Sequence, residues 1–188
     1  MSEPFVEVVA SDALSERVAQ LAADLRADLE GEVPVVVGIL QGSVPFLADL
    51  VRGLDPRLEV DFMALTRFGM DGRIGISMDT SIPLEDRHVV IVEDIVDTGL
   101  TLASLLRLIE VRGPASLRTV ALIDKSARRI VDVPIEHRGF EVGDEFLIGY
   151  GMDWEGKYRN LKSLWGVMDM SVLVQQPEAF DEVAFPRA

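Results

Sequence analysis

The segment "VVIVEDIVDTGLTL", residues 89–102, decides how the rest of the chain is interpreted. Apolar residues at 89–92 lead directly into Glu93 and Asp94, and Asp97 follows just before a turn that contains Thr98, Gly99 and Thr101. A continuous apolar run of this length is typical of a strand that is buried on both faces of a sheet. Carboxylates at such density repel one another and are costly to remove from water. The segment therefore predicts a buried strand whose end meets a cationic or hydroxyl-rich partner.

Strand and helix patterns alternate on both sides of this segment. Strands are expected at residues 33–40, 58–65, 88–95, 116–124 and 145–151. Helices are expected at residues 11–31, 44–52 and 99–111. Because several of the strands are apolar throughout and alternate with helices, the sequence predicts an α/β domain with a mostly parallel sheet flanked by helices.

The first predicted helix has an apolar stripe at helical spacing, with Ser11 or Asp12 available as its N-cap. The stripe consists of Leu14, Val18, Leu21, Leu25 and Leu29. Such a stripe is typical of an amphipathic helix with one buried face.

Two regions depart from the alternation of strands and helices. Residues 66–87 combine several glycines with mixed polarity, and this pattern predicts a long loop or a hairpin that acts as a lid. The ends of the chain, about 1–10 and 152–188, lack the alternation and are expected to pack as a small, irregular hood. With 188 residues and no repeat or linker, 1–188 is expected to form a single domain.

The composition limits the partners and the compartment. The chain has 18 Lys and Arg residues against 32 Asp and Glu residues, and the net charge of −14 disfavours broad attraction to nucleic acid. No apolar run reaches the length of a bilayer, so we expect no membrane partner. The absence of cysteine excludes disulfides and fits a reducing cytoplasm.

The acidic end of the strand is a candidate ligand site. In open α/β sheets, ligands bind beyond the carboxyl ends of the strands. Glu93 and Asp94 can both reach one ligand only if the chain curls there, because neighbouring side chains of an extended strand point to opposite faces. Thr98, Thr101 and the free amides of the following helix offer a cradle for phosphate. The residues alone favour a phosphorylated ribose and a solvated acidic turn about equally.

The segment 89–102 resembles the phosphoribosyl pyrophosphate (PRPP) motif of the type I phosphoribosyltransferases. Further segments resemble the hypoxanthine-guanine branch of that family, in the family's order, over about residues 33–167. They are the pyrophosphate loop "VVGILQGSVPFLADLVR" (36–52), the strand into the lid "VDFMALTRFG" (60–69), the purine-contacting segment "LIDKSARR" (122–129) and the C-terminal signature at 131–161. Several independent motifs in order are far more specific than a single match.

The resemblance implies an activity and a cofactor. The implied enzyme transfers the 5-phosphoribosyl group from PRPP to hypoxanthine or guanine, releases pyrophosphate, and serves purine salvage. The resemblance also implies Mg²⁺ as the cofactor and a homodimer or homotetramer in the cytoplasm. The implied fold is a type I phosphoribosyltransferase core with a flexible lid and a small hood from the termini.

The resemblance assigns roles to the acidic segment. Glu93 and Asp94 would hold the ribose hydroxyls and, with Asp153, magnesium, which prefers oxygen ligands. Asp97 would be the general base at the purine imidazole edge. The residues implied to grip the 5′-phosphate are Thr98, Gly99, Leu100 and Thr101.

The pyrophosphate side contains two departures from the family. Gly42 would present backbone amides to pyrophosphate, with Gln41 beside it, and Arg159 would neutralise the leaving group. The family commonly has lysine at the position of Gln41, next to a strained peptide, so its loss is expected to weaken pyrophosphate binding or alter subunit contacts. Many relatives have Ser-Tyr in the lid at the position of Arg67-Phe68, so one lid hydrogen bond is expected to be missing.

On the base side, Lys125 would donate to the purine 6-oxo group, Phe146 would stack on the base, and the backbone at Leu147 would read its edge.

Two other classes of protein share parts of this pattern. A catalytically weak nucleotide-binding regulator on the same fold would favour a basic surface, and it could dispense with the catalytic groups that this chain retains. A phospho-receiver domain would need an acidic pair after the first apolar strand, where this chain has Gln41 and Gly42.

Overall fold

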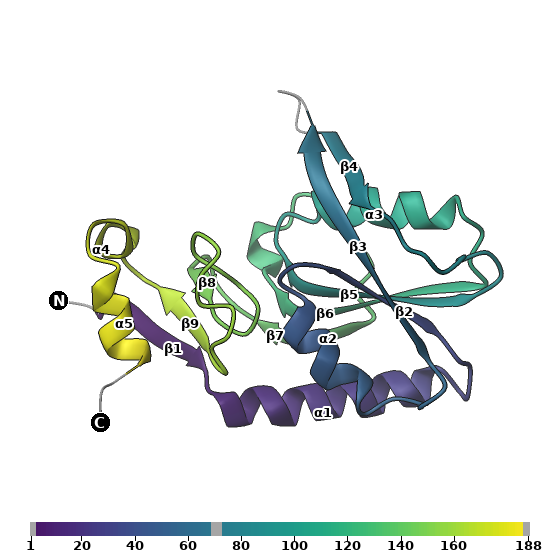
Figure 1. Cartoon of the computed structure of the whole chain (residues 1–188), viewed down its shortest axis with the longest axis horizontal. Coiled ribbons are helices and arrows are strands. Elements are labelled where there is room, and N and C mark those ends of the chain that lie inside the picture. Colours follow the sequence, from purple (N-terminus) through teal and green to yellow (C-terminus); the bar gives the residue numbers. More distant parts are fainter. Residues whose placement is uncertain (1–2, 69–72, 186–188) are drawn as a thin grey trace.

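The computed structural model describes residues 3–68 and 73–185, with the side chains of residues 67, 68 and 73 left undescribed (Figure 1). In this part of the chain, a large sheet has the strand order β4-β3-β2-β5-β6-β7. Its strands are β2 (Val35–Leu40), β3 (Glu59–Phe68), β4 (Arg73–Met78), β5 (His88–Val96), β6 (Ser116–Asp124) and β7 (His137–Glu141). The pairs β2–β3, β2–β5, β5–β6 and β6–β7 are parallel, and only β3–β4 is antiparallel among the pairs of this sheet. The predicted α/β class with a mostly parallel sheet is confirmed.

Helices cover both faces of this sheet. On one face, α1 (Ser11–Asp28) and α2 (Val44–Val51) pack against side chains such as Val36 and Val90. On the other face, α3 (Leu100–Glu110) packs against the alternate residues, including Val37 and Ile91. Side chains of a strand alternate between faces, which explains why apolar runs are buried throughout.

The predicted apolar stripe of α1 is buried along its whole length, from Leu14 to Leu29. The predicted N-cap is wrong, because α1 begins at Ser11 and its N-cap is Ala10, without a side-chain hydrogen bond. The helix therefore depends on burial of its apolar face rather than on a cap.

A second, three-stranded sheet lies beside the large one, with the order β1-β9-β8 within the described residues (Figure 1). Its strands are β1 (Phe5–Val9), β8 (Phe146–Ile148) and β9 (Leu164–Val167), and it packs with α4 (Met170–Gln175) and α5 (Glu178–Ala184). Phe180 is completely buried there, and its ring meets those of Phe5, Tyr158 and Trp165 edge-on. Only the expected irregularity is wrong, because the ends of the chain contribute regular strands and helices to this small unit.

Three further differences concern single elements. The strand expected at 145–151 is limited to β8 and belongs to the small antiparallel sheet. β7 was not predicted, because its sequence "HRGFE" has no apolar run. At 66–87 the hairpin alternative is observed, since β3 and β4 pair antiparallel, while its tip at 69–72 lies outside the described residues. Across the described ranges, no helix is both long and apolar enough to span a membrane.

Candidate active site

The site lies where β2 and β5 end side by side. These two strands are parallel neighbours, while the chain continues from β2 into α2 and from β5 into α3. The connections 41–43 and 97–99 therefore face each other at the carboxyl edge of the sheet. This is the position at which open α/β sheets bind ligands.

The first connection is packed tightly against the carboxylate of Asp94. A Cβ atom placed on Gly42 would lie 1.6 Å from Asp94 Oδ2, so no side chain fits there. On the far side, a Cβ on Gly151 would lie 1.9 Å from the Gly42 carbonyl oxygen. The Leu40–Gln41 peptide bond is cis. Glycine is thus required at position 42 because Asp94 approaches the backbone closely. This requirement adds to the predicted one, that the backbone be accessible to pyrophosphate.

Glu93 and Asp94 differ in environment. Burial, and then the charge of Asp94, raises the pKa of Glu93 well above its ordinary value. Burial also raises the pKa of Asp94, against backbone hydrogen bonds and the charge of Arg159, which lower it. The curl expected at these residues is not observed, because β5 continues as a strand to Val96. Asp94 is therefore directed to the ligand side, and Glu93 is almost completely enclosed.

The turn after β5 is held from behind by the segment 129–131. Gly99 adopts φ +84°, and a Cβ there would lie 2.3 Å from the Val131 carbonyl oxygen. The amides of Ile130 and Val131 donate to the Thr98 carbonyl oxygen at 2.9 and 3.1 Å. Gly99 then serves as the N-cap of α3 without a side-chain hydrogen bond. The first amide of α3, at Leu100, makes only a long contact of 3.5 Å with Thr98 Oγ1, and the predicted phosphate site at this turn stays a prediction.

A hollow of about 320 Å³ adjoins this turn. This inner hollow is lined by Asp94, Ile95, Asp97, Lys125, Phe146, Leu147, Met152 and Asp153. Lys125 is 6% exposed, and its ammonium group donates to the Glu145 carbonyl oxygen at 2.6 Å. Phe146 is 38% exposed and meets Trp154 edge-on, so one face of its ring is open to a ligand. Residues predicted separately for metal, base and catalysis thus line one space.

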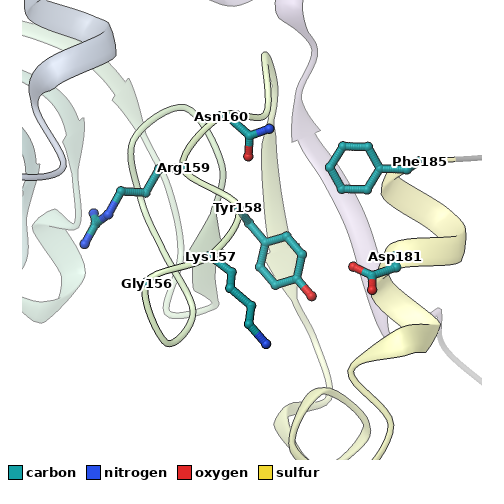
Figure 2. Close-up of a pocket in the computed structure, with 7 residues that line it drawn as sticks. All are labelled: Gly156, Lys157, Tyr158, Arg159, Asn160, Asp181 and Phe185. Carbon is teal, nitrogen blue, oxygen red and sulfur yellow. The ribbon is translucent and has the colours of Figure 1, made fainter.

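Two of the predicted residues are paired with each other. Arg159 Nη2 lies 2.8 Å from Asp153 Oδ1, and Arg159 Nη1 donates to the Gly151 carbonyl oxygen at 2.6 Å. Figure 2 shows that Arg159 points away from the outer face on which Lys157 and Tyr158 lie. That outer face also has Asp181, which together with burial raises the pKa of Tyr158 to about 12. Arg159 and Asp153 therefore belong to the inner side of this loop.

The carboxylates fit the magnesium ion that the family resemblance implies. Asp94 and Asp153 line the same hollow, and the charge of Asp153 contributes to the raised pKa of Asp94. A divalent cation between them would remove this repulsion. Among the described side chains, no group of three His, Cys, Asp or Glu residues is arranged to hold a metal alone. The donor set thus suits magnesium, which keeps several ligands from water and substrate.

Sequence reasoning missed two arginines and one aspartate that support the site. Arg129 Nη1 donates to the Asp97 carbonyl oxygen at 2.9 Å, and its Nη2 pairs with the buried Asp124. Arg128 Nε lies 2.7 Å from Asp97 Oδ1. The available signal was the pair of arginines in "DKSARR", directly after Lys125.

Comparison with known proteins identifies the family. Residues 7–155 match the family model "Phosphoribosyl transferase domain". The chain is 36% identical over 169 residues to the hypoxanthine-guanine phosphoribosyltransferase of Bacillus subtilis (strain 168). The aligned residues cover 88% of this chain and 93% of that protein. It is 40% identical over 158 residues to the bifunctional protein TilS/HprT of Listeria innocua, covering 82% of this chain but only 24% of that protein, so it spans about a quarter of that relative's length.

A solved structure gives the same result. The hypoxanthine-guanine phosphoribosyltransferase (hpt-2) of Bacillus anthracis, with a HEPES molecule in its active site, aligns with a TM-score of 0.83 and 36% identity. The alignment covers 86% of this chain and 98% of that chain. The predicted family and the predicted fold are therefore confirmed. This chain belongs to the phosphoribosyl transferase domain family.

Proposed function

We propose that this chain transfers the 5-phosphoribosyl group of PRPP to a 6-oxopurine, hypoxanthine or guanine, and releases pyrophosphate. The products are inosine or guanosine monophosphate, as purine salvage requires. The observation that most supports this proposal is that Asp97, Lys125 and Phe146 line the same hollow as Asp94 and Asp153. The names of the B. subtilis and B. anthracis relatives agree with the predicted activity.

On the base side, each proposed role follows from the group's surroundings. The half-exposed ring of Phe146 offers a stacking surface for a purine. The buried ammonium of Lys125 donates to the 6-oxo group. Adenine carries an amino group at this position, which cannot accept that hydrogen bond, so adenine is disfavoured. Asp97 accepts the imidazole proton as a purine nitrogen attacks C1 of the ribose.

On the PRPP side, Asp94 accepts hydrogen bonds from the ribose hydroxyls, whereas Glu93 stays enclosed beside it in β5. The 5′-phosphate lies at Thr98, Thr101 and the amides of the turn at Gly99 and Leu100. The backbone at Gln41 and Gly42, with the guanidinium of Arg159, holds the pyrophosphate. Asp94 and Asp153 would hold magnesium, which would supply positive charge to the phosphate oxygens of the substrate.

The reaction needs no protein nucleophile. The C1–O bond to pyrophosphate breaks, a C1–N bond to the purine forms, and positive character develops on the ribose in between. The chain contributes placement of the two substrates, fixed charge complementarity and exclusion of water. We assign the last of these to residues 66–87 as a lid over a single domain at 1–188, with the small sheet as its hood.

Assembly and compartment are part of the same proposal. We expect a cytoplasmic homodimer or homotetramer that acts on small molecules and needs neither nucleic acid nor membrane. The acidic surplus supports the absence of a nucleic-acid partner, and the absence of cysteine fits the proposed compartment. Sedimentation equilibrium of the purified chain, with and without PRPP and Mg²⁺, measures the assembly directly.

The activity is tested with the chain, PRPP, Mg²⁺ and hypoxanthine, with inosine monophosphate as the measured product. Adenine in place of hypoxanthine is the control for base selection, and the Asp97→Asn variant is the control for a contaminating enzyme. Competition among hypoxanthine, guanine and xanthine then ranks the bases. Absence of turnover with all three would overturn the proposal and favour a nucleotide-binding regulator on the same fold.

A further inference from the structure

Arg128 lies at the end of the short helical turn η1 (Ser126–Arg128), directly after the proposed base-contacting residue Lys125. Its side chain lines a second hollow of about 620 Å³, the outer hollow. The outer hollow shares Asp97, Lys125 and Phe146 with the inner hollow, and Asp144 also lines it. Arg128 therefore stands next to the place proposed for the purine, although neither the family resemblance nor the proposed mechanism gives it a role.

The guanidinium of Arg128 contacts two carboxylates. Its Nε lies 2.7 Å from Asp97 Oδ1, and its Nη1 pairs with Asp144. Within the described part of the chain, Asp97 Oδ1 is buried and accepts no well-directed hydrogen bond, so its contact with Arg128 is an ion pair of poor directionality. Arg128 thus covers the carboxylate of the proposed general base, but no well-directed hydrogen bond fixes it there.

The neighbouring Arg129 provides a contrast. Its side chain is 15% exposed and is fixed between the Asp97 carbonyl oxygen and the buried carboxylate of Asp124. The Arg128 side chain is 43% exposed, and that of Asp144 is 79% exposed. One arginine therefore fixes the backbone of Asp97, while the other contacts its carboxylate from a much more exposed position in the outer hollow.

We propose that Arg128 competes with the purine for Asp97: it pairs with the Asp97 carboxylate before a purine binds, and Asp144 retains its guanidinium when the purine replaces it. This inference rests on the proposed function. A purine whose imidazole proton goes to Asp97 has to displace Arg128, which weakens base binding. Asp144 has the opposite effect, because it stabilises the displaced arginine.

Substitutions of Arg128 and of Asp144 are therefore expected to change the KM for hypoxanthine in opposite directions. Arg128→Ala is expected to lower the KM for hypoxanthine by about threefold, since exposed ion pairs change equilibria by up to about fivefold. Asp144→Asn is expected to raise the same KM by about the same factor. The double variant is expected to behave like Arg128→Ala, because Asp144 has no role without the arginine. The KM for PRPP should stay unchanged in all three.

Arg57→Ala is the matched control, because Arg57 forms an exposed ion pair with Asp55 before β3, at the opposite edge of the parallel strands. Thermal unfolding of each variant checks the fold. An active wild type with an Arg128→Ala variant whose hypoxanthine KM is unchanged or higher would overturn this inference alone. A hypoxanthine KM that Asp144→Asn leaves unchanged or lowers would also overturn it. A wild type without turnover would overturn the proposed function as well.

Discussion

The two sides of the inner hollow are built on different principles. The sheet side, at the end of β5, places Asp94 at the hollow and encloses Glu93 next to it, on a strand whose pairing with β6 extends to Val96. The loop side, residues 149–159, places Asp153 and Arg159 on an irregular connection after β8, where the two side chains pair with each other. The sheet side is therefore rigid and acidic, whereas the loop side is neutralised internally.

This difference determines what a ligand does on each side. Burial raises the pKa of both Glu93 and Asp94, so their charged forms are costly until a cation or hydroxyl groups reach them. On the loop side, Arg159 and Asp153 have each other as partners before any ligand arrives. Binding thus supplies missing partners to the sheet side and rearranges existing partners on the loop side.

The largest expected effect comes from the carboxylate that follows the sheet side. Asp97→Asn keeps the shape of the side chain but removes its ability to take a proton. We expect kcat to fall by about 10²- to 10⁴-fold, with a nearly unchanged KM for PRPP. Steady-state kinetics with hypoxanthine measures both constants. Turnover close to that of the wild type would remove Asp97 from the proposed mechanism.

The rigidity of the sheet side predicts the next effect, at Gly42. In Gly42→Ala the new methyl group would lie 1.6 Å from Asp94 Oδ2, so the carboxylate has to leave its position. We expect the KM for PRPP to rise by more than about tenfold, because a misplaced contact group commonly costs that much. The matched test is the same substitution in an Asp94→Ala background, where it should have little further effect. An equally large effect in both backgrounds would show that Asp94 is not the cause.

Much of the sheet side was accessible from sequence. The apolar strands of the core can be recognised from their runs of apolar residues. The sequence motifs then show which functional residues follow the ends of those strands. The small sheet was not accessible, because β1 and β9 are short and pair across nearly the whole chain, as in Phe5 with Val167. Such pairings depend on tertiary packing rather than on local pattern.

The same distinction holds within the site. Asp94 and Gly42 were both predicted as ligand-contacting residues, yet their mutual packing depends on how two connections meet in space. The pairs Arg159–Asp153 and Arg128–Asp97 likewise depend on side-chain conformations on loops. Periodicity and motif spacing contain no information about such contacts, so the sequence predicted the members of the site but not their partners.

The loop side gives a smaller effect, because its ion pair is partly exposed. Arg159→Ala removes the partner of Asp153 and the cation proposed for pyrophosphate, and we expect the KM for PRPP to rise by about tenfold. Lys157→Ala is the matched control, since Figure 2 shows Lys157 on the outer face, away from Arg159. Its KM for PRPP should equal that of the wild type. Equal effects of the two substitutions would mean that general positive charge, and not the position of Arg159, matters.

The smallest expected effect is on stability, and it tests the cost of the buried acidic side directly. Because the pKa of Glu93 is raised in the folded protein, the folded state binds more protons than the unfolded state between the ordinary value of 4.5 and the raised value. Stability therefore falls as pH rises through this window. Glu93→Gln removes that loss, so without PRPP and Mg²⁺ the variant should melt roughly 5 °C above the wild type at about pH 8, with a gap that closes towards about pH 4.5. Thermal melts across this pH range measure the difference. A difference in melting temperature that does not change with pH would mean that the folded protein does not raise the pKa of Glu93.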